Sequence, residues 1–345
     1  MKAAWLTDIR SVEIRDQPVP VLQRPGDVLL RVETVGVCGS DMHYYRSGRI
    51  GTQVVQFPWL IGHEMSATVV EADADATGVD VAQRVAVDPL IACGQCDQCL
   101  SGRRHTCRNQ RFLGCPGQVA GCLAEYIVMP GENCFPAPAS MDAVAAALVE
   151  PVSVGIYARQ LADVAAGDAV AVLGAGPIGL SVLRACRAAG VERIYVTEIR
   201  DGRAKLAGEL GAMWTGNPQR EDIVAALLRR EPRGLAAVFE CAGEQSTLDE
   251  ALALARPGGK LMMVGIPPAD RVSFDVSTLR REEITIQPVR RQNECMPAAV
   301  ELVDHDPSLR RMVTHEYPLS ATQGAFDTVA DYRDDVVKAM IHVRQ

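Results

Sequence analysis

The sequence predicts an α/β protein of two domains: a β-rich domain, and a domain with a doubly wound parallel sheet. Residues 1–150 consist largely of short β-branched runs separated by glycine, proline and aspartate, which is typical of strands and turns. Residues 151–285 instead alternate apolar, strand-like runs with helical patterns, as a parallel sheet covered by helices requires. At 345 residues, the chain is long enough for two domains.

Three runs in the first domain predict strands: "VLLRVETVGVC" (28–38), "ATVVEA" (67–72) and "RVAVDPLIA" (84–92). The pattern after residue 290 is mixed, and we expect this segment to fold back onto the first domain. The first domain would then comprise residues 1–150 and 290–345, and the second residues 151–289.

The second domain contains five runs that resemble buried strands: "AVAVLG" (169–174), "RIYVTEI" (193–199), "AAVFECAG" (236–243), "KLMMVGI" (260–266) and "ITIQPV" (284–289). Helical patterns lie between them at 177–190 and 246–259. We expect the first helix to end at Gly190 and the second at Pro257, which two glycines follow. This alternation predicts a doubly wound sheet.

The composition narrows the function classes. Lys and Arg number 35 against 43 Asp and Glu, a net charge of −8, which disfavours binding to nucleic acid or to an anionic membrane surface. The opening residues are charged and lack the apolar core of a signal peptide. No uncharged stretch reaches the roughly 18 residues of a membrane span. We therefore expect a cytoplasmic protein.

Four of the eleven cysteines form a compact pattern, C-x2-C-x2-C-x7-C, at Cys93, Cys96, Cys99 and Cys107. Clustered cysteines in a reducing compartment bind metal more often than they form disulfides. Four thiolates around a zinc ion leave no open position, so this zinc would be structural. An iron–sulfur cluster and four unrelated free thiols are the alternatives.

A glycine motif, Gly174-x-Gly176-x-x-Gly179, directly follows one predicted strand and opens a helix. In this context the glycines permit a tight turn and let pyrophosphate approach the helix N-terminus. Glu198, at the end of the next strand, would bind the ribose hydroxyls and favour NAD over NADP. Arg203 could stack on adenine and leaves some tolerance of NADP open. A glycine-rich turn without a ligand is the alternative.

A second metal centre is suggested by Cys38 in "GVCGSDMHYY" and His63 in "GHE". With one carboxylate, these residues would hold a zinc ion that keeps an open position, as catalysis requires. Both Glu64 and Glu150 are available as that carboxylate. On residue type alone, a buried cysteine and histidine fit an ordinary core equally well.

Taken in order, "GVCGSDMH", "GHE", the four-cysteine segment, "EPVSVG" and "GAGPIG" resemble the zinc-dependent medium-chain alcohol dehydrogenases. Further segments, "SDMHYYRSGRIG", "LVEPVSVGIYA", "VTEIRDGR" and "VTHEYPL", resemble their sorbitol (polyol) branch. The resemblance runs from about residue 2 to 342. It implies a GroES-like catalytic domain, completed by the C-terminal segment, and a Rossmann domain that binds NAD.

The resemblance also implies roles for individual residues. Cys38, His63 and Glu64 would hold the catalytic zinc, and Glu150 would hold its water or exchange with Glu64. Ser40 would hydrogen-bond the substrate oxygen, and His43 would pass the proton toward solvent. Tyr44 and Arg291 would contact the polyol. The residues expected at the cofactor are Gly174, Gly176, Pro177, Ile178, Gly179, Glu198, Arg203, Val264, Gly265, Ile266, Val289 and Arg291.

The expected activity is transfer of a hydride from a secondary hydroxyl of a polyol to NAD, which gives a ketose. Where the branch usually has tyrosine after the arginine, this chain has Gln292, which would alter the far wall of the pocket. Arg290 adds a cation that would suit an acidic sugar, and a surface ion pair is the alternative for this residue. A threonine 3-dehydrogenase or an idonate-type aldonate dehydrogenase is therefore the alternative, and a non-catalytic NAD-binding protein is a remote one. Members of the family are commonly tetramers or dimers, so we expect a homotetramer or homodimer.

Overall fold

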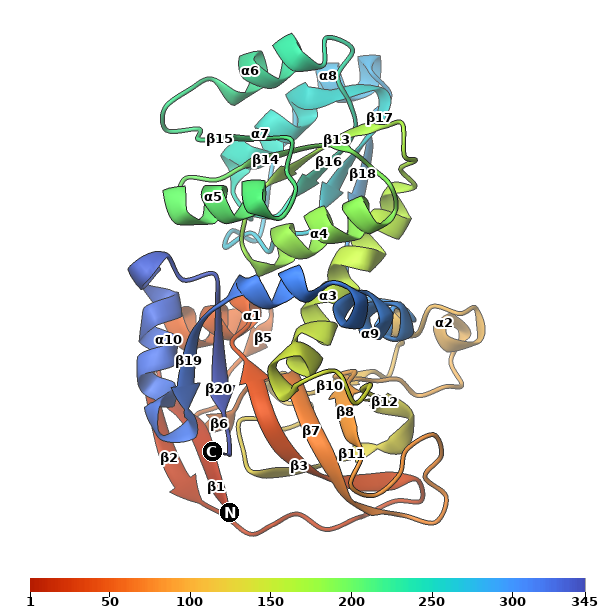
Figure 1. Cartoon of the computed structure of the whole chain (residues 1–345), viewed down its shortest axis with the longest axis vertical. Helices are drawn as coiled ribbons and strands as arrows, with labels where there is room; N and C mark the ends of the chain where they lie inside the picture. Colours follow the sequence, from red (N-terminus) through yellow and green to blue (C-terminus); the bar gives the residue numbers. More distant parts are fainter. Residues whose placement is uncertain (345) are drawn as a thin grey trace. The chain divides into compact units, whose positions relative to one another are not determined.

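The computed structural model describes residues 1–344 and consists of two compact units (Figure 1). The first unit comprises residues 1–150 and the chain from Met296 onward, and the second comprises Pro151–Cys295. The chain therefore returns from the second unit to the first after Cys295, later than the position near residue 290 that the sequence suggests. Cys295 belongs to the second unit because its thiol donates a hydrogen bond to Oε1 of Gln160, 3.3 Å away in the same unit.

The first unit is built on a seven-stranded sheet in the order β12-β8-β7-β3-β20-β19, with β11 also paired to β3. Its strands are β1 (Lys2–Asp8), β2 (Ser11–Asp16), β3 (Asp27–Gly36), β4 (Arg49–Ile50), β5 (Gln53–Val54), β6 (Trp59–Leu60), β7 (Glu64–Ala72), β8 (Arg84–Val87), β9 (Leu90–Ile91), β10 (Arg111–Phe112), β11 (Tyr126–Pro130), β12 (Cys134–Pro136), β19 (Val313–Pro318) and β20 (Lys338–His342). Its helices are α1 (Gly39–Ser47), α2 (Asp97–Leu100), α9 (Met296–His305) and α10 (Thr322–Ala330). Helix α3 (Ala143–Ala162) continues from this unit into the second.

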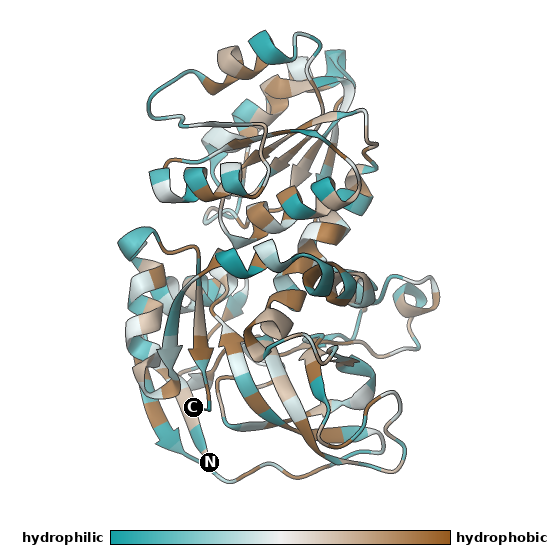
Figure 2. Ribbon diagram, viewed as in Figure 1, coloured by the Kyte–Doolittle hydropathy of each residue, from teal (hydrophilic) through white to brown (hydrophobic). Residues whose placement is uncertain are grey.

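The core of the first unit forms where the apolar runs predict it. Val28, Leu30, Val32 and Val35 of β3 are each fully buried, and they pack in one cluster with apolar residues of β7, β8 and β20. Figure 2 shows the apolar residues concentrated along the central strands, with polar residues on the outer faces of the helices. Strand β20 pairs with β3, so the C-terminal segment completes this sheet.

The second unit has a six-stranded sheet in the order β15-β14-β13-β16-β17-β18, and all its pairs are parallel. The strands are β13 (Ala169–Leu173), β14 (Arg193–Thr197), β15 (Trp214–Gly216), β16 (Leu235–Glu240), β17 (Ala255–Met263) and β18 (Thr285–Pro288). The helices are α4 (Pro177–Ala188), α5 (Asp201–Glu209), α6 (Ile223–Arg230), α7 (Gln245–Leu254) and α8 (Val276–Arg281). Strands β13 and β16 are buried along their whole length.

The order of these strands defines where a ligand would bind. The chain starts in the middle of the sheet at β13, builds outward to β15, and then crosses back to β16 on the other side. This is the Rossmann order, and it confirms the predicted fold class. In such sheets the ligand crevice lies at the carboxyl ends of the strands where the direction of building reverses. Here that point is the end of β13, where the glycine motif begins.

One predicted boundary was wrong. Helix α7 ends at Leu254 rather than at Pro257, and residues from Ala255 onward already belong to β17. The residue before a proline is disfavoured in the helical conformation, so Arg256 is extended and the helix ends earlier. Within residues 1–344, none of the helices has the length and apolar character needed to cross a membrane.

Candidate functional site

The sulfur atoms of Cys93, Cys96, Cys99 and Cys107 converge within 4.8 Å of one another. Cys96 Sγ lies 3.6 Å from Cys99 Sγ and 3.9 Å from Cys107 Sγ. A disulfide requires about 2.0 Å, so these thiols are not bridged. Four sulfurs bound at about 2.3 Å to one zinc ion would be about 3.8 Å apart. The segment therefore fits a single, fully coordinated zinc ion, whereas an iron–sulfur cluster would spread the thiolates around several atoms.

Two thiols of this segment, Cys96 and Cys99, have strongly shifted pKa values. Backbone amides of Cys99 and Arg108 lower the pKa of Cys96 to about 6, which favours the thiolate that binds metal. Burial and the neighbouring thiols of Cys107 and Cys96 raise the pKa of Cys99 to about 12. Crowded thiols resist full ionisation, and a bound cation would relieve this repulsion.

Cys38, His63 and Glu64 form a second cluster, whose ligand atoms also lie within 4.8 Å of one another. Cys38 directly precedes α1, and Glu64 is the first residue of β7. Strands β3 and β7 pair with Gly36 opposite Glu64, and this register brings the two segments together. One sulfur, one nitrogen and one carboxylate oxygen fit zinc and leave a fourth position open.

Two neighbouring side chains orient these ligands. Asp41 Oδ1 lies 3.6 Å from Nδ1 of His63, and its Oδ2 accepts the backbone N–H of Cys38 at 3.3 Å. Burial alone would lower the pKa of His63, but the negative charges of Cys38 and Asp41 raise it well above its usual value. The Ser40 hydroxyl donates to Cys38 Sγ at 3.3 Å. A carboxylate behind a ligating histidine fixes the ring for metal binding.

Glu150 lies in α3 and is 6% exposed. Among residues 1–344, the group within 4.8 Å contains Glu64 and not Glu150. Burial raises the pKa of Glu150 to about 7; the charge of His63 opposes this shift and that of Glu64 adds to it. The geometry thus favours Glu64 as the third ligand, with Glu150 as a nearby carboxyl that can exchange a proton near neutral pH.

Tyr44 is 5% exposed, and its hydroxyl donates to Oε1 of Gln53 at 3.2 Å. It also lies 3.9 Å from Sγ of Cys115. Cys115 packs with Phe112, whose ring centroid lies 5.3 Å from that of His63. The Tyr44 hydroxyl is therefore connected to the predicted zinc ligand His63 through the buried side chains of Cys115 and Phe112.

His43, also on α1, is half-buried. Burial, and then the positive charge of Arg46, lower its pKa below the usual value. The imidazole is therefore neutral near pH 7 and able to accept a proton, as a relay residue must be.

The glycine motif forms the turn between β13 and α4. Gly174 has φ +102°, and a Cβ on Gly179 would overlap the carbonyl oxygen of Gly174. At Gly176 the space is open: apart from its own chain neighbours, the nearest heavy atom that residues 1–344 bring to an added Cβ is Nη1 of Arg203, at 3.8 Å. Pro177 occupies the first turn of α4. The turn is thus tight where the chain approaches itself and open where a pyrophosphate would lie.

Glu198 follows β14 directly and is 8% exposed. Its Oε2 accepts the backbone N–H of Ala175 at 2.9 Å, and its Oε1 accepts that of Arg200 at 3.0 Å. The carboxylate therefore braces the glycine turn, and it retains lone pairs for further donors such as ribose hydroxyls.

Val264, Gly265 and Ile266 follow β17, and the first two contact Glu240. The backbone N–H groups of Val264 and Gly265 each donate to the carbonyl oxygen of Glu240 at 2.9 Å. The Glu240 side chain is fully buried and accepts the N–H of Gly243 at 2.6 Å. A side chain at position 265 would meet Oε2 of Glu240 at 2.8 Å, so glycine is required there.

The loop after β18 carries Val289 and Arg291. The Val289 N–H donates to the carbonyl oxygen of Met263 at 2.8 Å, and Arg291 has φ +56°. Gln292 is 4% exposed, and its Oε1 accepts the N–H of Cys295 at 2.7 Å. The amide oxygen of Gln292 therefore braces this loop, a role that we did not expect from the sequence.

Sequence reasoning also missed Asp41, Glu240 and Lys338. Asp41 could have been identified from its position, because it lies only three residues after the predicted ligand Cys38. Glu240 and Lys338 are charged residues within otherwise apolar runs, "AAVFECAG" and "VVKAMIHV". A charge at a buried strand position requires a partner, and this is the pattern that could have identified both residues.

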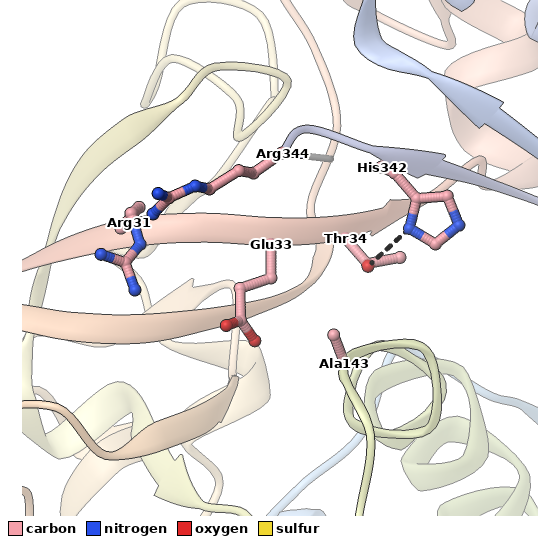
Figure 3. A pocket seen from close by; sticks show the side chains of 6 residues that line it. All are labelled: Arg31, Glu33, Thr34, Ala143, His342 and Arg344. Carbon is pink, nitrogen blue, oxygen red and sulfur yellow. Dashed lines mark hydrogen bonds between the residues drawn. The ribbon is translucent and has the colours of Figure 1, made fainter.

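A separate hollow of about 240 Å³ in the first unit is bounded by β3, the end of β20 and the start of α3 (Figure 3). It is lined by Arg31, Glu33, Thr34, Ala143, His342 and Arg344. Glu33 binds Arg84 at 2.6 Å, and Thr34 Oγ1 lies 3.4 Å from Nδ1 of His342. None of the predicted zinc ligands lines this hollow.

Comparison with known proteins gives the family. Residues 24–139 match the model of the alcohol dehydrogenase GroES-like domain, and residues 177–305 match that of the zinc-binding dehydrogenases. Sorbitol dehydrogenase of Bacillus subtilis is 34% identical over 344 residues, which cover 99% of this chain and 97% of the relative. L-idonate 5-dehydrogenase of Vitis vinifera is 32% identical over 336 residues, which cover 95% of this chain and 91% of the relative.

Among solved structures, a putative zinc-binding dehydrogenase from Sinorhizobium meliloti bound to NADP superposes with a TM-score of 0.89. It is 29% identical, and the match covers 99% of this chain and 98% of that one. Both family models match in order along the chain, and the residues of both candidate metal clusters lie within the range of the first. This chain therefore belongs to the zinc-dependent medium-chain alcohol dehydrogenases, in their polyol dehydrogenase branch.

Proposed function

We propose that this protein is an NAD-dependent polyol dehydrogenase that converts a secondary hydroxyl of a sugar alcohol to a ketone. The observation that carries this proposal is the convergence of Cys38, His63 and Glu64 within 4.8 Å in a chain of this family. When bound there, a zinc ion supplies Lewis-acid chemistry that favours loss of a proton from a substrate hydroxyl.

The residues around the centre support the remaining steps. The Ser40 hydroxyl, 3.3 Å from Cys38 Sγ, would hold the substrate oxygen by a hydrogen bond. The neutral imidazole of His43 would take the proton toward solvent. Glu150, with a pKa raised to about 7 by burial, would hold a water molecule or a proton near the metal ligands.

A polyol offers several hydroxyl groups, and Tyr44 supports its recognition. The Tyr44 O–H donates to Gln53, and a phenolic oxygen is also a hydrogen-bond acceptor of the kind that a substrate hydroxyl needs. Arg291 follows β18 and Val289. On the basis of this position, we assign it a second contact with the substrate and a contact with the cofactor.

We assign the second unit to the dinucleotide and the first to the catalytic zinc. The open space at Gly176 and the carboxylate of Glu198 support NAD rather than NADP, since a carboxylate at the ribose would repel a 2′-phosphate. Pro177, Ile178, Gly179, Arg203, Val264, Gly265, Ile266 and Val289 complete the proposed cofactor site. The four-cysteine segment would hold the second, structural zinc.

We further propose a homotetramer or homodimer in the cytoplasm. The proposed oligomeric state is based on the family resemblance alone. The compartment is supported by the cysteines, which form no disulfides within residues 1–344 and suit a reducing environment.

An idonate-type aldonate dehydrogenase is the second candidate. The cation of Arg290 favours it, because a carboxylate substrate needs a positive partner, and an L-idonate dehydrogenase is among the relatives.

The test is NADH or NADPH formation by the zinc-loaded protein with a panel of polyols, aldonates and threonine. We expect turnover of a polyol with NAD, and loss of that turnover in Cys38→Ser but not in the control Cys134→Ser, whose thiol is buried elsewhere. Turnover of an aldonate or threonine alone would reject the polyol assignment. No turnover of any alcohol by a chain that holds two zinc ions would reject the proposed reaction.

A further inference from the structure

A buried lysine lies beside the predicted catalytic zinc ligands. Lys338 begins β20, and its side chain is 1% exposed. Its Nζ donates to Oε2 of Glu64, also 1% exposed, and to the carbonyl oxygen of Val37 at 3.0 Å. Lysine is almost never fully buried without a partner. The fold therefore places a cation in direct contact with one predicted ligand and next to the chain segment that carries another.

The backbone is arranged to accommodate this pair. Gly36 of β3 pairs with Glu64 of β7 on one side and with Met340 of β20 on the other. A Cβ on Gly36 would overlap Oε2 of Glu64 and come within 2.9 Å of Cε of Lys338. The contact between Lys338 and Glu64 therefore depends on the absence of a side chain at position 36.

The lysine has two physical consequences for the ligand set. It engages Oε2 of Glu64, which leaves Oε1 of the same carboxylate for a metal ion. Its positive charge also acts on the half-buried thiol of Cys38 and on the buried carboxylates of Glu64 and Glu150. Without a cation, buried carboxylates are strongly unfavourable.

We propose that Lys338 is a positioning residue of the metal centre: it fixes Glu64 as a single-oxygen ligand and offsets the anionic charge of the site while it is free of metal. This inference rests on the proposed zinc function. The same positive charge repels a divalent ion, so Lys338 stabilises the metal-free protein and weakens metal binding. A lysine with a purely structural role would instead stabilise the metal-free and metal-loaded forms equally.

The test compares the wild type, Lys338→Met and the charge-retaining control Lys338→Arg. Each is unfolded by urea in metal-free and zinc-loaded forms, and each metal-free form is titrated with Co²⁺, whose visible spectrum reports on the ligand geometry. We expect Lys338→Met to destabilise the metal-free form more than the loaded one. We also expect it to bind Co²⁺ at the Cys38 site about tenfold more tightly, or more, with an altered spectrum.

Lys338→Arg should keep the affinity close to that of the wild type. Equal destabilisation of both forms with unchanged Co²⁺ affinity, or weaker Co²⁺ binding by Lys338→Met, would overturn the inference. If Lys338→Met does not fold, the double variant Lys338→Met/Glu64→Gln replaces the ion pair by a neutral one and should fold again. If the double variant also fails to fold, the inference about Lys338 would be overturned as well.

The number of ions bound by the wild type separates this inference from the proposed function. Two ions per chain, with Lys338→Met unchanged, would overturn the inference alone. One ion per chain, at the four cysteines, would overturn the proposed reaction and the inference together.

Discussion

The carboxylate of Glu198 accepts the backbone N–H of Ala175 at 2.9 Å, so the residue expected to bind the cofactor ribose also braces the glycine turn. Both functions require a negatively charged acceptor at this position. Loss of the carboxylate should therefore weaken cofactor binding directly and through the turn.

For Glu198→Gln we expect kcat/KM with NAD to fall by about ten- to a hundredfold, because a buried N–H loses a charged acceptor and the ribose hydroxyls lose theirs. The value with NADP should fall less, because repulsion of the 2′-phosphate is removed. Steady-state kinetics with both cofactors provide the measurement. Exposed Glu192 offers the control Glu192→Gln, and an unchanged NAD to NADP ratio in Glu198→Gln would contradict the assignment.

Two glycines of the motif should respond differently to alanine. At Gly179 a Cβ overlaps the carbonyl oxygen of Gly174, so Gly179→Ala should unfold at a markedly lower temperature. At Gly176, where φ is −73° and the nearest atom to a Cβ is 3.8 Å away, Gly176→Ala should fold normally. It should nevertheless bind NADH weakly, because the methyl group occupies the pyrophosphate space. Thermal unfolding and NADH fluorescence titration test the pair; tight NADH binding by Gly176→Ala would argue against this site.

The four-cysteine segment should account for one zinc ion per chain. Cys96→Ser replaces a thiolate by a poor zinc ligand, so we expect the zinc content to fall from two ions to one and the melting temperature to drop. Metal analysis and thermal unfolding are the measurements. Cys134→Ser, in which the hydroxyl can still donate to the carbonyl oxygen of Pro130, should keep both ions. Retention of two ions by Cys96→Ser would show that the segment is not a zinc site.

Stability in acid should depend on Asp327 of α10. Burial tends to raise its pKa, but hydrogen bonds from Gln323, Tyr45 and Arg10 lower it below the ordinary value of 3.8. Since the folded pKa is the lower one, the unfolded chain binds more protons, and the contribution of Asp327 is present above pH 3.8 and lost as the pH falls through the folded value.

Asp327→Asn should therefore cost about 1–2 kcal/mol of unfolding free energy at pH 7 and less near pH 3. Urea denaturation across this range measures the difference, with exposed Glu301→Gln as the control. A loss that is the same at both pH values would mean that the charge of Asp327 does not contribute.

The sequence by itself determined the features whose geometry is local. The spacing of Cys93, Cys96, Cys99 and Cys107 lets one short segment surround an ion, and Gly174, Gly176 and Gly179 form a turn that their own neighbours define. For the same reason the alternation of strands and helices predicted the Rossmann sheet. The end of α7 at Leu254 was missed because the restriction from Pro257 outweighed the apolar periodicity.

Only the tertiary structure shows how the candidate metal centre is assembled. Cys38, the adjacent residues His63 and Glu64, and Lys338 come from three separate segments, and the register of β3 with β7 and β20 brings these segments together. On residue type alone Glu64 and Glu150 were both available, and the family resemblance favoured Glu64. The pairing of Gly36 with Glu64 places that carboxylate beside Cys38 and His63. Strand register depends on the packing of the whole sheet, and no local spacing encodes it.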